Sequence, residues 1–161
     1  MEKEYAMSEI EIVTKSLPAV RLAARAAVVA GQPEVAGVVG PLFDAVGDIL
    51  ASADVPLDRP IARYEMAEDG LHILAGYAVT SGAPDGVEVV DLPSVPIAIC
   101  GVHLGSMDGI RDSWQAVHTE MTARGFAPSG PCREVYVRAV SEDQSDWVTE
   151  LQQPVMRAQL S

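Results

Sequence analysis

A short segment of the chain occurs twice, and this repeat constrains the fold more than any other feature. Residues 17–23 read LPAVRLA and residues 92–98 read LPSVPIA, with four identities in seven positions and an offset of 75 residues. Strand-like apolar runs flank each copy, and they cover residues 10–14, 20–29, 87–90 and 95–104. In a chain of 161 residues, such a repeat indicates two similar halves.

Each half continues into a helical pattern. In the second half, apolar residues recur at helical spacing over residues 110–121, after Ser106, which suits an N-cap, and before Gly125, which suits a C-terminal cap. In the first half, a similar stripe covers residues 35–50 and contains Pro41. Because proline removes a helical hydrogen bond, this helix either kinks at Pro41 or begins near it.

Two strand-like segments follow each helical pattern, and they cover residues 61–66, 71–80, 131–140 and 147–151. An Asp69-Gly70 turn signal separates the first two segments. The order strand-strand-helix-strand-strand thus occurs twice. It predicts an α+β fold of pseudo-twofold duplicated units, with antiparallel sheets, helices on one side and a ligand groove on the other, in a cleft between the halves.

The chain length of 161 residues suits one domain. We expect residues 1–6 to form a disordered leader. Residues 7–161 are expected to form a single domain of two half-repeats, at about 7–82 and 83–161.

The net charge of −12 limits the classes of partner. A field of this sign repels phosphate backbones and attracts cations, so we expect no direct nucleic-acid binding, although acidic surfaces also serve solubility. Charges and prolines interrupt the apolar runs, so no membrane association is expected. The charged N-terminus without a signal-peptide core, and two cysteines interpreted as reduced, favour a cytoplasmic location.

The sequence offers no motif for a metal or cofactor, and we expect neither. His72, His103 and His118 lack ligand spacing with one another or with cysteine and acid pairs. No phosphate loop or dinucleotide fingerprint occurs. Cys132 has no histidine in local register and is interpreted as a small apolar residue.

Three segments of the second half carry a resemblance to a known family. They read VHLGSMDGI at residues 102–110, GPCREVYV at residues 130–137, and DWVTEL at residues 146–151 with Pro-Val at residues 154–155. IARY at residues 61–64 and GYAV at residues 76–79 match more weakly. From about Ile10 onward, the chain resembles the GyrI-like small-molecule-binding domain, which is also the effector-binding domain of AraC-type and MerR-type multidrug regulators.

The resemblance implies a hydrophobic, aromatic-lined groove with an acidic residue at its centre, which by position is Glu134. Family members are effector domains joined to DNA-binding helices, stand-alone toxin-sequestering or gyrase-inhibitory proteins, or hydrolases that open cyclopropanes in genotoxic natural products. This chain has no DNA-binding helices at either end, so a stand-alone form is expected.

Glu134 is the main candidate for a site residue. In a strand, Glu134 and Tyr136 share one face, while Val135 and Val137 share the other. We expect the valines in the helix-covered core and the other two in the groove, where a carboxylate beside an aromatic face favours a cation. The alternative for Glu134 is a surface carboxylate paired with a neighbouring arginine such as Arg133.

Further ligand-binding candidates are Tyr64, Trp147 and Met66, each with core packing as the alternative. Tyr77 is left open between the core and the groove. Trp114 lies on the helical stripe, so core packing is favoured for it, although the resemblance implies that clefts in the family can reach such positions.

The predicted function is a stand-alone protein that captures hydrophobic, aromatic or cationic small molecules. The alternative is a hydrolase in which Glu134 is a general base and Tyr136 or Tyr64 stabilises the developing anion. No catalytic residue is assigned on sequence alone. A protein partner, such as a regulator or gyrase, has no specific signal in the sequence.

Overall fold

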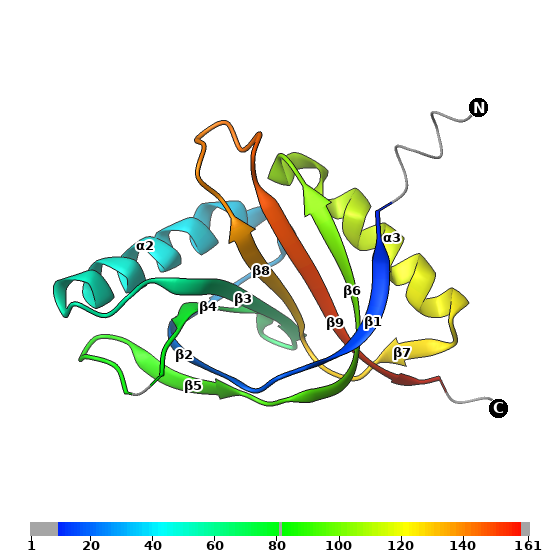
Figure 1. Ribbon diagram of the computed structural model, residues 1–161, viewed down its shortest axis with the longest axis horizontal. Helices are drawn as coiled ribbons and strands as arrows, with labels where there is room; N and C mark the ends of the chain where they lie inside the picture. The colour runs from blue at the N-terminus through cyan, green and yellow to red at the C-terminus, as the bar shows by residue number, and fades with distance from the viewer. Residues whose placement is uncertain (1–9, 81, 159–161) are drawn as a thin grey trace. The chain divides into compact units, whose positions relative to one another are not determined.

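The computed structural model describes residues 10–80 and 82–158 (Figure 1). The expected leader, residues 1–6, lies outside the described residues. The chain forms two compact units, one from the residues up to Leu17 together with those from Val95 onward, and the other from Pro18–Ser94.

The first unit is an antiparallel sheet with one helix. Its strands neighbour one another in the order β1 (Ile12–Leu17), β6 (Val95–Leu104), β9 (Val148–Arg157) and β8 (Cys132–Arg138). The short strand β7 (Phe126–Pro128) pairs with the end of β9. Between β6 and β7, the 3₁₀ turn η2 (Met107–Gly109) leads into α3 (Ile110–Ala123).

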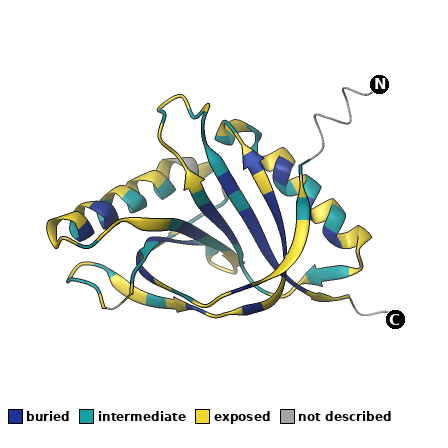
Figure 2. Cartoon of the chain, in the orientation of Figure 1, coloured by how far each residue is buried: buried dark blue, intermediate teal, exposed yellow. Residues whose placement is uncertain are grey.

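Apolar side chains of α3 pack on one face of this sheet. Val117 and Met121 of the helix contact a buried cluster formed by Ile99, Leu151 and Val155 of β6 and β9. Figure 2 shows much of β9 in the colour of buried residues. Full burial of one such side chain stabilises the fold by about 1.5–3 kcal/mol, so this cluster holds α3 against the sheet.

The predicted end of this helix at Gly125 is confirmed, whereas the cap predicted at Ser106 belongs to the 3₁₀ turn that precedes α3. Ser106 caps the 3₁₀ turn, where its hydroxyl accepts a hydrogen bond from the amide of Asp108 at 3.1 Å. Gly125 follows the helix with a φ of +82°, a left-handed conformation that glycine adopts without steric cost.

The second unit repeats the arrangement. Its strands neighbour one another in the order β5 (Glu88–Leu92), β2 (Val20–Val29), β4 (Gly70–Ala78) and β3 (Asp58–Ala67). The turn η1 (Gln32–Glu34) precedes α2 (Ala36–Ser52), whose Val46 and Leu50 pack with Ala23 of β2.

Pro41 lies inside α2, so the alternative that this helix begins near Pro41 is wrong. The helix begins at Ala36, and Pro41 removes one hydrogen bond from within it. In the described part of the chain, no helix combines the length and the apolar character needed to cross a membrane.

The duplicated α+β topology is confirmed, with one difference in how the repeats pair. In both units, the strand that follows the Leu-Pro segment is flanked by a strand from the other sequence repeat: β6 pairs with β1, and β2 pairs with β5. The chain therefore passes from one unit to the other at Leu17-Pro18 and just after Leu92-Pro93. Proline has no amide hydrogen to donate to a neighbouring strand, so it interrupts strand pairing where the chain leaves one unit for the other. The half-repeats follow the order of elements along the chain. In the compact units, the first strand of each half-repeat, β1 or β5, belongs to the unit that contains the rest of the other half-repeat.

The last strand is longer than the sequence analysis expected. The pattern ended it at Leu151, whereas β9 continues through Pro154 to Arg157. Pro154 cannot donate, but its carbonyl oxygen accepts a hydrogen bond from the Ser129 amide at 2.9 Å. The pairing of β7 with this extension was not predicted, because three residues show no clear alternation.

Candidate functional site

A buried carboxylate, held by two aromatic side chains, is the most distinctive polar feature of the first unit. Glu134 of β8 is 6% exposed. Its Oε2 accepts a hydrogen bond from Nε1 of Trp114 at 2.8 Å, and its Oε1 accepts one from the hydroxyl of Tyr136 at 2.6 Å. Burying a carboxylate without donors is costly, so these two bonds permit Glu134 to lie here. We call Glu134, Trp114 and Tyr136 the Glu134 cluster.

The register of the sheet explains how the cluster assembles. Glu134 lies opposite Leu151 of β9, and Tyr136 lies opposite Thr149. Cross-strand partners share a face, and Leu151 packs against the helix, so both site residues face α3. Trp114 lies in α3 and packs at the margin of the same apolar cluster, with its indole N–H directed at Glu134.

The expected assignment of faces is wrong in one respect. Glu134 and Tyr136 do share a face, but it is the helix-covered face, where the sequence analysis placed Val135 and Val137. The pattern favoured apolar residues under the helix, whereas donors from Trp114 and Tyr136 make a carboxylate acceptable there. Its burial also excludes the alternative of a solvent-exposed carboxylate.

A second polar pair under α3 was not predicted from the sequence. His103 of β6 is 5% exposed, and its Nδ1 lies 2.7 Å from the hydroxyl oxygen of Ser113 in α3. Its Nε2 lies 2.8 Å from the carbonyl oxygen of Ser106, which can only accept, so Nε2 carries a proton. A signal existed in the sequence: Ser113 lies three residues after Ile110 and four before Val117, so helical spacing places it on their apolar face.

Trp147 lies just before β9, in a polar loop at residues 141–147. Its indole N–H donates to the carbonyl oxygen of Ser141 at 2.8 Å, and its carbonyl accepts from the amide of Gly105. Trp147 therefore joins two loops, and a role in ligand binding stays a prediction.

Asp146 organises the same loop. Its carboxylate accepts hydrogen bonds from the hydroxyl and amide of Ser141, at 2.7 and 3.0 Å, and from Nε of Arg138 at 3.1 Å. The hydrogen bonds from Ser141 lower the pKa of Asp146 most, and the hydrogen bond and charge of Arg138 lower it further, to about 2.

Replacing Asp146 by asparagine is expected to lower the melting temperature at pH 6 and to have a much smaller effect at pH 2. A lowered pKa means that the ionised group stabilises the fold above its ordinary value of 3.8, and that this contribution is lost as the pH falls toward about 2. Thermal unfolding of both proteins at the two pH values measures the difference. Glu142→Gln, in the same loop, is the control. An equal deficit at both pH values would contradict this origin.

Tyr64, Tyr77 and Met66 belong to the second unit. Tyr77 packs in the α2-covered core and meets the ring of Phe43 edge-on at 5.7 Å, which settles its open assignment in favour of the core. The register of β3 and β4 places Tyr64 and Met66 on the same face as Tyr77. Tyr64 is part-buried, whereas Met66 is 66% exposed. Their ligand-binding roles stay predictions.

The cysteines are poor candidates for nucleophiles. Burial, and then the charge of Glu134, raise the pKa of the Cys132 thiol to about 12. Burial likewise raises the pKa of Cys100 to about 11. Both are therefore protonated at neutral pH, and the reactive thiolate is not populated. Among residues 10–80 and 82–158, no group of three histidine, cysteine or acidic side chains is arranged to hold a metal.

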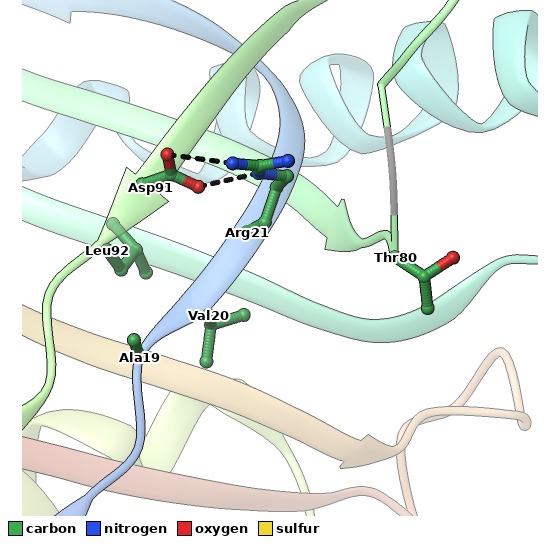
Figure 3. A pocket seen from close by; sticks show the side chains of 6 residues that line it. All are labelled: Ala19, Val20, Arg21, Thr80, Asp91 and Leu92. Atoms are coloured by element: carbon green, nitrogen blue, oxygen red, sulfur yellow. Dashed lines mark hydrogen bonds and ion pairs between the residues drawn. The ribbon is translucent and has the colours of Figure 1, made fainter.

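A hollow of about 300 Å³ lies in the second unit, and none of the predicted site residues is among those that line it. Figure 3 shows the side chains that line it, which are Ala19, Val20, Arg21, Thr80, Asp91 and Leu92. Arg21 and Asp91 bond each other there, with Nε to Oδ1 at 2.8 Å, so their charges are already matched. The Glu134 cluster combines a buried carboxylate with aromatic rings and is the stronger candidate site.

Solved structures share this architecture. The C-terminal domain of EcmrR matches with a TM-score of 0.75 and 18% identity, over 92% of this chain and 99% of that one. SAV2435, bound to tetraphenylphosphonium, matches with a TM-score of 0.68 and 15% identity, over 91% and 94% of the two chains. The chain has the GyrI-like fold.

The GyrI-like fold was expected from the sequence resemblance and is confirmed. A hydrolase from Listeria innocua shares it with a TM-score of 0.60 and 12% identity, over 96% of each chain. Identities this low establish the fold alone. No family model and no curated protein matches the sequence.

Proposed function

We propose that this protein binds hydrophobic organic cations at the Glu134 cluster. The observation that carries the proposal is a carboxylate, 6% exposed, between the indole of Trp114 and the phenol of Tyr136. In this proposal, Glu134 and Tyr136 bind the ligand as the sequence predicts, and Trp114 is a third ligand-binding residue.

Charge and aromatic faces both favour a cation at this place. At about 4 Å and an effective dielectric constant of about 20, opposite unit charges attract by about 4 kcal/mol, before the cost of removing both from water. A cation over an aromatic ring gains about 0.5–2 kcal/mol more. The net charge of −12 draws cations toward the protein and disfavours nucleic acid as a partner.

The shared fold suggests the probe. SAV2435 is bound to tetraphenylphosphonium, a bulky aromatic cation. The methyltriphenylphosphonium cation and neutral triphenylphosphine oxide have similar size and shape, so they form a matched pair of ligands.

Calorimetric titration of the wild-type protein with this pair tests the function. We expect the cation to bind at least about tenfold more tightly than the oxide, because only the cation gains from the carboxylate. Equal affinities would show that the charge of the ligand does not contribute to binding. Absence of binding of both compounds would contradict the proposal.

The contact between Tyr136 and Glu134 favours a second candidate, a hydrolase. An O–O distance of 2.6 Å permits proton transfer between a general base and a phenol that stabilises an anion. Incubation with a cyclopropane-containing alkylating compound, followed by mass spectrometry, tests this candidate. Unchanged compound that nevertheless binds would exclude catalysis on that class.

We also propose a cytoplasmic location. Cys100 and Cys132 are both thiols rather than members of a disulfide, as expected in a reducing compartment.

A further inference from the structure

The buried pair of His103 and Ser113 has a position that bears on the Glu134 cluster. Ser113 and Trp114 are consecutive residues near the start of α3. Ser113 bonds to His103 on β6, whereas Trp114 bonds to Glu134 on β8. Both β6 and β8 pair with β9, so the two bonds reach strands on opposite sides of β9.

Consecutive residues of a helix point about 100° apart around its axis. Two bonds from such neighbours to different strands therefore fix the rotation of the helix about its axis, which apolar contacts alone restrain less well. Apolar packing is non-directional, while a hydrogen bond weakens steeply with misalignment. If α3 rolled, the indole N–H of Trp114 would leave Oε2 of Glu134.

A hydrogen bond to the backbone just before the helix orients the imidazole of His103. The carbonyl of Ser106 accepts from its Nε2 at 2.8 Å, which turns Nδ1 toward the Ser113 hydroxyl, 2.7 Å away. Ser106 also caps the turn that leads into α3, with a hydrogen bond from the Asp108 amide. The imidazole thus links the end of β6, the turn and the helix.

The geometry points to His103 and Ser113 as positioning residues that set the affinity of the Glu134 cluster, by holding Trp114 against the carboxylate. This inference rests on the proposed function for its effect on ligand binding. Its structural part concerns the Trp114–Glu134 bond and can be measured without any ligand.

The test uses the indole N–H resonances of the full-length protein in a ¹H–¹⁵N NMR spectrum. The chain has two tryptophans. Trp114 reports the cluster, and Trp147, which bonds to Ser141, is an internal control for folding. A Trp114→Phe variant assigns the two signals.

In Ser113→Ala, we expect the Trp114 signal to shift and its exchange with solvent to become about 2–10-fold faster, since one hydrogen bond is lost. The affinity for methyltriphenylphosphonium should change by a similar factor. Ser113→Thr keeps a hydroxyl and should restore both readouts. Thr119→Ala, which removes an exposed hydroxyl from the same helix, should change neither.

An unchanged Trp114 signal in a Ser113→Ala protein whose Trp147 signal is normal would overturn the inference. If Ser113→Ala disturbs both signals, His103→Phe provides the second test, because it keeps a planar ring and removes the ring nitrogen that meets the Ser113 hydroxyl. We expect this variant to shift the Trp114 signal and to keep the Trp147 signal, and an unchanged Trp114 signal would also overturn the inference. Absence of phosphonium binding to the wild-type protein would instead count against the proposed function alone.

Discussion

Replacing Glu134 by glutamine is expected to weaken the binding of methyltriphenylphosphonium by about 10–100-fold, while the affinity for triphenylphosphine oxide changes by less than about threefold. The lost factor corresponds to about 1.4–2.7 kcal/mol, which is what remains of a charge attraction after desolvation. Calorimetric titration of the variant with both compounds measures the difference.

Glutamine is a close substitute for the geometry of this site. Its amide oxygen can accept from Trp114, and its amide nitrogen can donate to the phenol oxygen of Tyr136. The fold should therefore be retained, and the melting temperature checks this. Glu142→Gln, an exposed carboxylate in the loop before β9, removes the same charge and should leave both affinities unchanged. Equal loss for the cation and the oxide would show that the charge of Glu134 has no role.

Replacing Gly76 by alanine is expected to destabilise the protein by more than about 2 kcal/mol. Gly76 lies opposite Ala24 in the pairing of β4 with β2. A Cβ atom there would overlap the carbonyl oxygen of Ala23 and lie 2.8 Å from Cα of Ala24, so the backbone would have to move. Overpacking against rigid surroundings typically costs about 1–3 kcal/mol, and here a ladder is disturbed as well. Denaturant unfolding measures the loss.

Gly37→Ala is the matched control for this change. Gly37 lies in α2, and outside its chain neighbours a Cβ atom would meet nothing within 4 Å. Alanine favours a helix by about 1 kcal/mol over glycine, so this variant should be more stable than the wild type. A Gly76→Ala protein as stable as the wild type would contradict the close approach of β2 and β4.

Local patterns predicted the elements of this fold well. Helical spacing from Ile110 to Met121 gave α3, and alternation gave the shared face of Glu134 and Tyr136. These features depend on neighbours in sequence, which a pattern records. The doubled Leu-Pro segment also indicated the duplicated topology, because each copy lies where the chain passes between the units.

Features that depend on distant partners were not predicted. The pairing of β1 with β6 rather than β2 joins residues far apart in the chain. The side of the sheet on which Glu134 lies depends on its register with Leu151, and a shift of one residue would reverse it. For the same reason, Trp114 was assigned to the core by its helical stripe, while its bond to Glu134 could be seen only once β8 and α3 were placed.

A crystal structure of the protein with methyltriphenylphosphonium tests the central claim most directly. We expect the phosphorus atom within about 6 Å of the Glu134 carboxylate, with a phenyl ring against Trp114 or Tyr136. A cation bound elsewhere, for example in the hollow beside Arg21 and Asp91, with Glu134 remote from it, would contradict the account.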